Sequence, residues 1–161
     1  MSETGGQSQV RSRALSALYG LAIGDALGMP TESCSRPDIV ARYGRLLGGF
    51  EPGPADHPLA GGLPAGTVTD DTGQAVVLAG LIVDGHGDID PAEFAERLLA
   101  WEGSMRARGA LGLLGPSTKR ALSALAAGGR IEDVGRSGTT NGAAMRITPV
   151  GVATPSGDPG L

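Results

Sequence analysis

The chain has 161 residues, which is enough for one globular domain with its own hydrophobic core. Its net charge of −4, from 13 basic and 17 acidic residues without a basic run, argues against binding to nucleic acid or to a charged membrane surface. Cys34 is the single cysteine, which excludes an internal disulfide framework and a cysteine-rich zinc site.

The N-terminal residues do not resemble a secretory signal. Residues 1–9 are small and polar, and Gly20, Gly24 and Asp25 interrupt the apolar stretch that follows them. No uninterrupted apolar run reaches the roughly 20 residues that a membrane span needs. We therefore expect a cytoplasmic protein that uses neither nucleic acid nor membrane as a partner, with residues 1–9 as a disordered tail.

The first predicted helix runs from Val10 to Met29. Apolar residues occur almost all round it, which is typical of a buried helix. Gly20, Gly24 and Gly28 recur every four residues and share one face, against which we expect another segment to pack closely. Asp25 lies beside this row, either as a buried carboxylate satisfied by hydrogen bonds or as a functional group.

Pro30 is expected to end the first helix. A second, short helix is predicted from Ser35 to Tyr43, because Ser35-Arg36-Pro37 is typical of a helix start. Residues 44–66 are then rich in Gly and Pro with little periodicity, which predicts a long loop. His57 lies in this loop, and we expect it to be solvated rather than to bind a ligand.

The most informative motif is Thr69-Asp70-Asp71-Thr72, at the start of a helix predicted from Asp70 to Asp84. Adjacent carboxylates repel each other more strongly as water is excluded, and a hard cation such as Mg²⁺ between them would offset that repulsion. The same residues also suit an ordinary helix start, with Thr69 as N-cap and both aspartates favoured by the helix dipole. The motif alone leaves both interpretations open.

Further helices are predicted from Pro91 to Trp101 or slightly beyond, from Pro116 to about residue 126, and as one turn over residues 131–134. We expect Trp101 to lie in the core. No segment alternates between apolar and polar residues with period two, so the predicted fold class is all-α.

The last polar feature is residues 136–142, which are small and polar and precede a helix predicted over residues 143–147. Backbone N–H groups and hydroxyls in such a loop could surround a phosphate without any lysine. The loop could equally be a plain turn in which Asn141 caps the helix.

Three motifs in this order resemble the ADP-ribosylglycohydrolase family. Residues 24–32 match the Gly-Asp-Ala-Leu-Gly-x-Pro-x-Glu pattern of the family's first helix at every position. Residues 69–72 and 141–146 match its Thr-Asp-Asp-Thr and Asn-Gly-Ala-Ala-Met-Arg elements. The resemblance extends from about Val10 to Val152 and predicts a compact all-helical domain of that type.

The resemblance also implies a site with two Mg²⁺ ions in a central cleft. Thr69, Asp70 and Asp71 would supply metal ligands. Glu32, on a mobile loop beside the metals, would form the catalytic set together with Asp71 and Asp25, the last in a supporting position. The diphosphate of ADP-ribose would bind the loop made of Ser137, Gly138, Thr139, Thr140, Asn141 and Gly142.

The implied reaction is hydrolysis of the glycosidic bond that joins ADP-ribose to a protein side chain or a small molecule. Such a reaction passes through an oxocarbenium-like state, which a metal-activated water and a separate acid such as Glu32 would serve. Two other functions stay open: a non-catalytic protein that binds ADP-ribose or is structural, like the crystallin-like family members, and a helical interaction domain without a ligand.

Members of this family are longer and carry a second Asp-x-Asp-Thr/Ser element, which does not occur after Asn141 here. Asp158 stands alone in residues 154–161, which are expected to form a loose exit segment. We therefore expect residues 10–153 to be the N-terminal part of one domain with half of its metal site. Such a chain would be inactive alone, unstable or oligomeric, and would need a C-terminal half as partner.

Overall fold

The computed structural model describes residues 3–109 and 114–154 of the chain. These residues form helices, turns and loops without a strand, which confirms the all-α prediction for the described part. The elements, in chain order, are α1 (Glu3–Gly28), the 3-10 turn η1 (Met29–Thr31), α2 (Arg36–Tyr43), α3 (Asp70–Asp84), α4 (Pro91–Ala107), α5 (Pro116–Ala126), α6 (Ile131–Val134), α7 (Gly142–Met145) and α8 (Thr148–Ala153).

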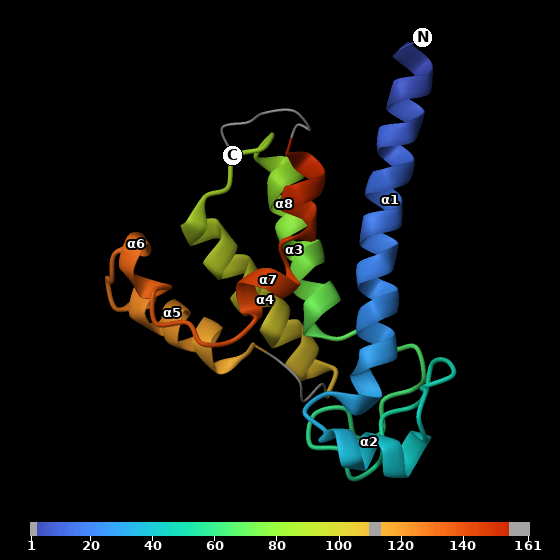
Figure 1. Ribbon diagram of the computed structural model, residues 1–161. Helices are drawn as coiled ribbons and strands as arrows, with labels where there is room; N and C mark the ends of the chain where they lie inside the picture. The colour runs from blue at the N-terminus through green and yellow to red at the C-terminus, as the bar shows by residue number, and fades with distance from the viewer. Residues whose placement is uncertain (1–2, 110–113, 155–161) are drawn as a thin grey trace.

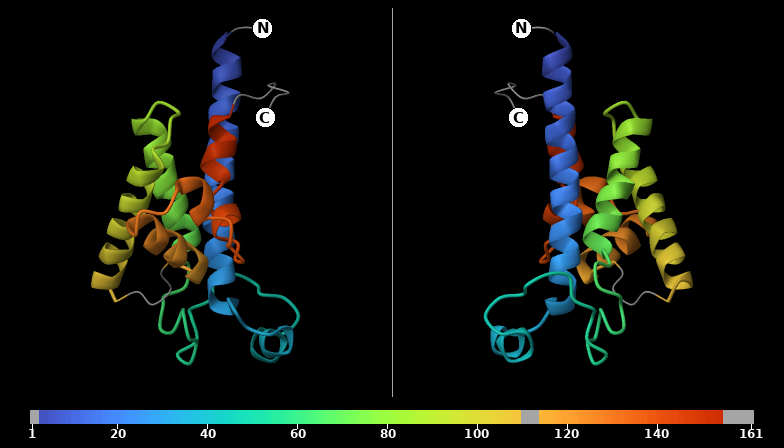
Figure 2. Two further views of the ribbon diagram at one scale, coloured as in Figure 1. Left: turned by 90° about the vertical axis from the view of Figure 1, so that its left-hand side faces the viewer. Right: turned by 90° about the vertical axis from the view of Figure 1, so that its right-hand side faces the viewer.

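Helix α3 is the centre of the arrangement, because it contacts α1, α4, α7 and α8. The long helix α1 runs along one side of this group (Figure 1, Figure 2), and in the view of Figure 1 α5 and α6 lie on the opposite side of the molecule from α1. Helix α2 and the loop of residues 44–69 gather at the C-terminal end of α1 (Figure 1). No helix in the described ranges is long and apolar enough to cross a membrane.

Local signals explain most helix starts. The Ser35 hydroxyl accepts the backbone N–H of Asp38 at the start of α2, and the Asp90 carboxylate accepts that of Ala92 at 2.8 Å at the start of α4. Proline occupies one of the first positions of α2, α4 and α5, where its missing N–H costs nothing. The predicted starts of α2 to α6 are therefore close to the observed ones, whereas α4 continues to Ala107, six residues past the predicted end near Trp101.

The described apolar core lies mainly between α3 and its neighbours. Helix α3 contributes Ala75, Leu78 and Leu81, which recur at helical spacing and are almost fully buried. Leu98 of α4 and Met29 after α1 are each 2% exposed and close this core from two sides. Core packing therefore fixes α3, the helix that begins with the Asp-Asp pair.

The prediction that α1 is a buried helix is wrong for the described residues. Leu15, Tyr19 and Ile23 are 43%, 65% and 49% exposed. A Cβ added at Gly20, Gly24 or Gly28 would meet no atom within 4 Å, so no described segment packs closely on the glycine row. The reason is that the described contacts of α1 are mainly with α3, α8 and η1, which cover only part of a helix that is apolar almost all round.

The two ends of the chain differ from prediction in different ways. Helix α1 already begins at Glu3, within the segment predicted to be a disordered tail. Adding residues to an existing helix costs far less than nucleating one, so α1 continues through these polar residues. At the other end, Thr154 closes α8 through its backbone N–H, which donates to the Val150 carbonyl at 2.9 Å. The rest of the predicted exit segment, including Asp158, lies outside the described residues.

Trp101 of α4 packs directly on the backbone of Gly73 in the first turn of α3. A Cβ on Gly73 would lie 2.6 Å from Nε1 and 2.7 Å from Cζ2 of this ring. We therefore expect Gly73→Ala to lower the free energy of unfolding by about 1–2 kcal/mol, since overpacking outweighs the gain in helix propensity. Urea unfolding followed by the fluorescence of Trp101, the single tryptophan, measures this loss.

Gly80→Ala in the same helix is the control for this prediction. Its Cβ would meet only the flexible end of Arg97, at 3.4 Å from Nη1. We expect this variant to be as stable as the parent or more stable by up to about 1 kcal/mol, because alanine favours the helix. Equal stabilities of the Gly73 and Gly80 variants would contradict the packing of Trp101 on Gly73.

Candidate active site

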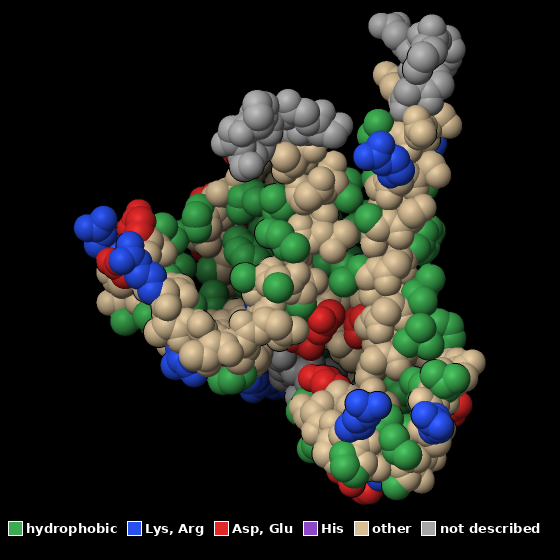
Figure 3. All heavy atoms as spheres, in the orientation of Figure 1, with side chains coloured by type: hydrophobic (Ala, Val, Ile, Leu, Met, Phe, Trp, Pro, Cys, Tyr) green, Lys and Arg blue, Asp and Glu red, His purple; other side chains and the backbone are tan. Residues whose placement is uncertain are grey.

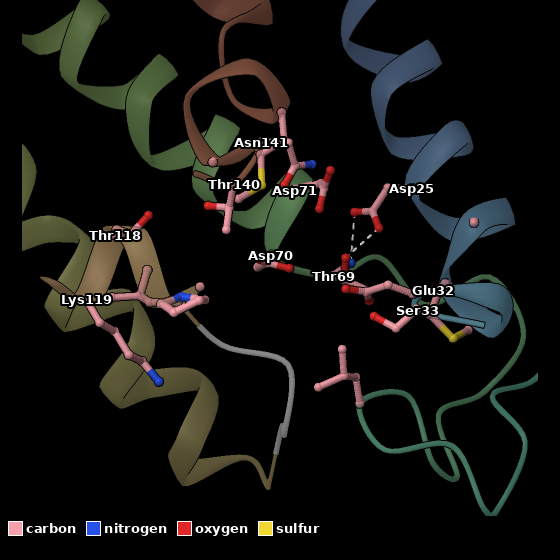
Figure 4. Close-up of a pocket in the computed structure, with 18 of the residues that line it drawn as sticks. Asp25, Glu32, Ser33, Thr69, Asp70, Asp71, Thr118, Lys119, Thr140 and Asn141 are labelled. Atoms are coloured by element: carbon pink, nitrogen blue, oxygen red, sulfur yellow. Dashed lines mark hydrogen bonds between the residues drawn. The ribbon is translucent and has the colours of Figure 1, made fainter. Parts of the chain in front are cut away.

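A cavity of about 700 Å³ lies where the C-terminal end of α1, the start of α3, the start of α5 and the loop before α7 meet (Figure 4). Acidic side chains gather in a hollow between α1, α7 and the region of α2 (Figure 3). Most of the predicted site residues line this cavity, namely Asp25, Glu32, Thr69, Asp70, Asp71, Thr140, Asn141 and Gly142. The structure therefore brings together residues from three separate sequence motifs.

Part of the predicted phosphate loop lies elsewhere. Ser137, Gly138 and Thr139 do not line the cavity. The backbone N–H of Thr139 instead donates to the Ser117 hydroxyl of α5 at 3.1 Å, which directs this stretch along α5. Asn141 occupies the N-cap position of α7, but its side chain makes no capping hydrogen bond. Only residues 140–142 of the predicted loop face the cavity.

Asp25 caps α3 from a different helix. Its Oδ2 accepts the backbone N–H groups of Thr69 and Thr72 at 2.8 and 3.1 Å and the Thr72 hydroxyl at 2.5 Å. Its Oδ1 accepts the Thr69 hydroxyl at 2.6 Å. The Thr69 side chain makes no capping hydrogen bond to α3, so Asp25 provides the N-cap that was predicted for Thr69. Both oxygens of Asp25 are therefore engaged in hydrogen bonds that hold the start of α3.

Asp70 and Asp71 begin α3 at the edge of the cavity, and neither has an ion-pair partner among the described residues. Burial raises the pKa of Asp70 to about 7, and the negative charges of Asp71 and Glu32 add to that effect. Burial followed by the charge of Asp25 raises the pKa of Asp71, while Arg146 opposes this rise. Both carboxylates are thus destabilised as anions.

Gln74, one turn further along α3, is fully buried and holds Asp70. Its Nε2 donates to Asp70 Oδ2 at 3.0 Å. Its Oε1 is buried without a hydrogen-bond partner in the described residues. The Gln74 amide therefore restrains one oxygen of Asp70 and leaves the other oxygen for contacts in the cavity.

Glu32 stands on the exposed side of the cavity, just after η1. Partial desolvation raises the pKa of Glu32, and the nearby charge of Asp71 raises it further. The resemblance implied a mobile loop here, yet the Glu32 carbonyl lies 2.8 Å from Nε2 of His57. His57 is only 6% exposed, so the prediction of a solvated histidine is wrong. Its burial follows from hydrogen bonds inside the loop, which sequence periodicity does not show.

Arg146 holds the loop before α7 from beneath. It is 7% exposed and donates through Nε to the Gly142 carbonyl and through Nη2 to the Thr118 hydroxyl at 2.9 Å. Its Cζ lies over the Phe94 ring, 5.8 Å from the ring centroid. A Cβ on Gly142 would lie 2.8 Å from Nη2, so a larger residue there would displace the guanidinium. Desolvation lowers the pKa of Arg146, and the charges of Asp70 and Asp71 oppose that.

Helix α5 also contributes to the cavity, which no sequence motif indicates. Thr118 and Lys119 line the cavity, and Lys119 is the only lysine of the chain. Its Nζ lies 3.3 Å from Glu102 Oε1, and its side chain is half exposed. In Figure 4, Thr118 and Lys119 lie across the cavity from Asp25 and Glu32. A lysine near a helix start is a common surface feature, so its position carried no signal.

The donor chemistry fits a hard cation in part. Thr69, Asp70, Asp71 and Glu32 offer only oxygen, and their pKa shifts show that unbalanced negative charge is costly here. The described residues contain no group of three His, Cys, Asp or Glu side chains close enough to hold a metal ion. Mg²⁺ commonly keeps several waters and takes only one or two protein carboxylates. Thr69, Asp70, Asp71 and Glu32 are therefore consistent with an incomplete set of oxygen ligands for such an ion.

Comparison with known proteins agrees with the three motifs. The ADP-ribosylglycohydrolase family model matches residues 6–161. The Escherichia coli (strain K12) protein YegU, described as uncharacterized, is 38% identical over 146 residues, which are 91% of this chain and 43% of the relative.

Two relatives carry functional names. The ADP-ribosyl-dinitrogen reductase glycohydrolase of Rhodospirillum rubrum is 30% identical over 150 residues, which are 90% of this chain and 46% of the relative. The ADP-ribosylarginine hydrolase Tri1 of Pseudomonas putida is 33% identical over 152 residues, which are 89% of this chain and 37% of the relative. The chain thus spans less than half the length of each of these relatives.

Proposed function

The chain belongs to the ADP-ribosylglycohydrolase family, and on that premise we propose that its cavity is part of a Mg²⁺-dependent site that hydrolyses ADP-ribosyl linkages. The observation that carries this proposal is the convergence of Asp70, Asp71 and Glu32 with residues 140–142 around one cavity. The substrate would be an ADP-ribosylated protein side chain or a related small molecule, as the names of two relatives suggest.

The side of the cavity that carries Asp70, Asp71 and Glu32 would bind the metal and the reacting ribose. Asp70, Asp71 and the Thr69 hydroxyl would hold Mg²⁺, which when bound orients ribose hydroxyls and lowers the pKa of a water. Glu32 keeps a raised pKa and stands at the open side, so it suits proton transfer at the glycosidic oxygen or nitrogen. Asp25 would keep the start of α3 in place, because it satisfies both threonines of the motif.

The side of the cavity formed by the loop before α7 and the start of α5 would receive the diphosphate. Thr140 and Asn141 offer polar groups there, and Gly142 leaves the backbone accessible. Lys119 is the cationic side chain among the residues that line the cavity. It lies across the cavity from Asp25 and Glu32, and it also pairs with Glu102 of α4. Together, the carboxylates and this polar side of the cavity would orient an ADP-ribosyl group with its ribose end toward the start of α3.

Because the relatives are more than twice as long as the matched segments, we propose that a segment equivalent to their second half supplies further metal ligands. That segment would act as the partner that completes the site. A second candidate function follows from the absence of a three-ligand cluster in the described residues: binding of ADP-ribose without catalysis.

Isothermal titration of the chain with Mg²⁺ and then with ADP-ribose tests the proposal. We expect Asp71→Asn to weaken Mg²⁺ binding about 10-fold or more, because a ligand is lost. Asp88→Asn is the matched control, since it removes the same charge from an exposed loop. Unchanged Mg²⁺ affinity in Asp71→Asn would refute the metal assignment.

Hydrolysis of an ADP-ribosylated protein should be measured in parallel, with the chain alone and with the second half of the Escherichia coli relative added. Release of ADP-ribose that depends on Mg²⁺ and on Glu32 would establish the enzyme. Binding of ADP-ribose without release in either sample would favour the second candidate.

A further inference from the structure

His57 contacts the backbone of Glu32 with a defined ring tautomer. Its Nδ1 accepts the backbone N–H groups of Leu59 at 3.1 Å and Ala60 at 2.8 Å. A ring nitrogen that accepts hydrogen bonds carries no proton, so the proton of the neutral ring is on Nε2. Nε2 lies 2.8 Å from the Glu32 carbonyl oxygen and therefore donates to it.

The loop that carries His57 is itself tied together. The His57 N–H donates to the Pro54 carbonyl at 2.8 Å, and the Gly53 N–H donates to the Leu63 carbonyl at 2.8 Å. The Ala60 carbonyl approaches Gly53 so closely that a Cβ there would lie 1.8 Å from its oxygen. The imidazole is thus mounted on a closed, internally hydrogen-bonded loop, which gives it a fixed position from which to hold another segment.

The segment that carries Glu32 needs such a restraint. On its N-terminal side, Met29 and Pro30 are buried, and the Glu32 N–H makes only a long bond of 3.4 Å to the Met29 carbonyl. On its C-terminal side, Ser33 has a φ of +58°, a left-handed conformation that is unfavourable for a residue with a Cβ. Within this segment the Cys34 N–H donates to the Thr31 carbonyl at 3.1 Å and closes a turn around Glu32. The bond from His57 to the Glu32 carbonyl ties this turn to the loop of residues 44–69.

We propose that His57 is a positioning residue, whose Nε2–H holds the Glu32 backbone so that the Glu32 carboxylate stays at the cavity. The role assigned to Glu32 rests on the proposed function, whereas the tether itself does not. Since His57 bonds the main chain and not the carboxylate, its loss would misplace the acid without removing any group that binds the substrate. The expected signature is therefore a fall in kcat with little change in KM.

Two substitutions separate the acceptor function of Nδ1 from the donor function of Nε2–H. His57→Asn keeps an acceptor near the position of Nδ1, for Leu59 and Ala60, and loses the donor to Glu32. His57→Gln keeps an N–H donor near the position of Nε2 and loses that acceptor. His86→Asn is the control, because His86 is exposed and has a φ of +54°, which asparagine tolerates.

Nuclear magnetic resonance of the whole chain detects the tether, the hydrogen bond from His57 Nε2–H to the Glu32 carbonyl, without an enzyme assay. His57 and His86 are the only histidines, so their ring nitrogens can be distinguished by the His86→Asn variant. We expect the Nε2–H tautomer at His57, a changed carbonyl ¹³C shift of Glu32 in His57→Asn, and its restoration in His57→Gln. An Nδ1–H tautomer, or an unchanged Glu32 carbonyl in His57→Asn, would overturn the proposal.

Kinetics then separate this proposal from the proposed function. With Mg²⁺, an ADP-ribosylated protein as substrate and the second half of the Escherichia coli relative added to every sample, we expect His57→Asn to lower kcat about 10-fold to 100-fold with KM nearly unchanged, and His57→Gln to recover part of the loss. In a Glu32→Gln background, His57→Asn should lower kcat no further. If the parent hydrolyses the substrate and His57→Asn keeps its kcat, the positioning role is refuted. If no sample hydrolyses it while the resonance results hold, the tether is supported and the proposed function fails.

Discussion

Replacement of Asp25 by alanine is expected to lower the free energy of unfolding by about 2–4 kcal/mol and to weaken Mg²⁺ binding as well. One carboxylate satisfies two backbone N–H groups and two hydroxyls of the first turn of α3, on Thr69 and Thr72. Without it, this turn loses its acceptor, and the turn carries Asp70 and Asp71. Urea unfolding followed by the fluorescence of Trp101, which packs on the same turn at Gly73, measures the stability.

Two controls separate capping from other effects. Asp25→Asn keeps the shape and one accepting oxygen, so we expect it to lose roughly half as much stability as Asp25→Ala. Ser35→Ala removes the side-chain cap of α2 and should cost about 1 kcal/mol while leaving Mg²⁺ affinity unchanged, because α2 does not line the cavity. An Asp25→Ala variant as stable as the parent would show that Asp25 does not cap α3.

Local chemistry explains what could be predicted from the sequence. Proline and capping residues mark the starts of α2, α4 and α5, and each signal acts within a few residues of the helix that it starts. The positions of Asp70 and Asp71 in a first helical turn follow in the same way. The family motifs then predict which of these helix starts share a cavity.

The remaining features depend on contacts between distant segments. Asp25 caps α3 from α1, His57 is buried by bonds that its own loop makes, and Lys119 reaches the cavity only because α5 lies beside α4. None of these contacts leaves a periodic signal. Helix α1 shows the converse case, since an apolar pattern indicates what a helix can bury but not which segments cover it.

The metal-free chain should become less stable as the pH rises from about 4 to about 7. The folded-state pKa of Asp70 is about 7, against 3.8 for the ordinary carboxyl. Between these values the folded chain binds a proton that the unfolded chain does not, so the free energy of unfolding falls with rising pH. The raised pKa values of Asp71 and Glu32 act in the same direction.

Asp70→Asn should remove much of this slope. At pH 8 we expect the metal-free variant to be more stable than the parent by about 2 kcal/mol, or roughly 5 °C in Tm, less than the full pKa difference implies because water reaches part of the carboxyl. At pH 4 the two should be nearly equal, since Asp70 is then protonated in the folded parent. The buried Gln74 amide can hydrogen-bond an asparagine as well as a carboxyl, so the substitution leaves no new unpaired group.

Mg²⁺ should reverse the order of the two proteins. A cation binds the deprotonated carboxylates, so saturating Mg²⁺ should raise the Tm of the parent more at pH 8 than at pH 6 and should raise that of Asp70→Asn little at either pH. Thermal unfolding at both pH values, with and without Mg²⁺ and with Asp88→Asn as the charge control, gives the comparison. A parent whose stability does not fall between pH 4 and 7 would contradict the burial of Asp70. If the stability of the parent falls with pH as expected but Mg²⁺ does not raise its Tm, the burial of Asp70 is supported and the metal assignment fails. The two claims are separable because the cost of ionising the buried Asp70 carboxyl is present before any ion binds.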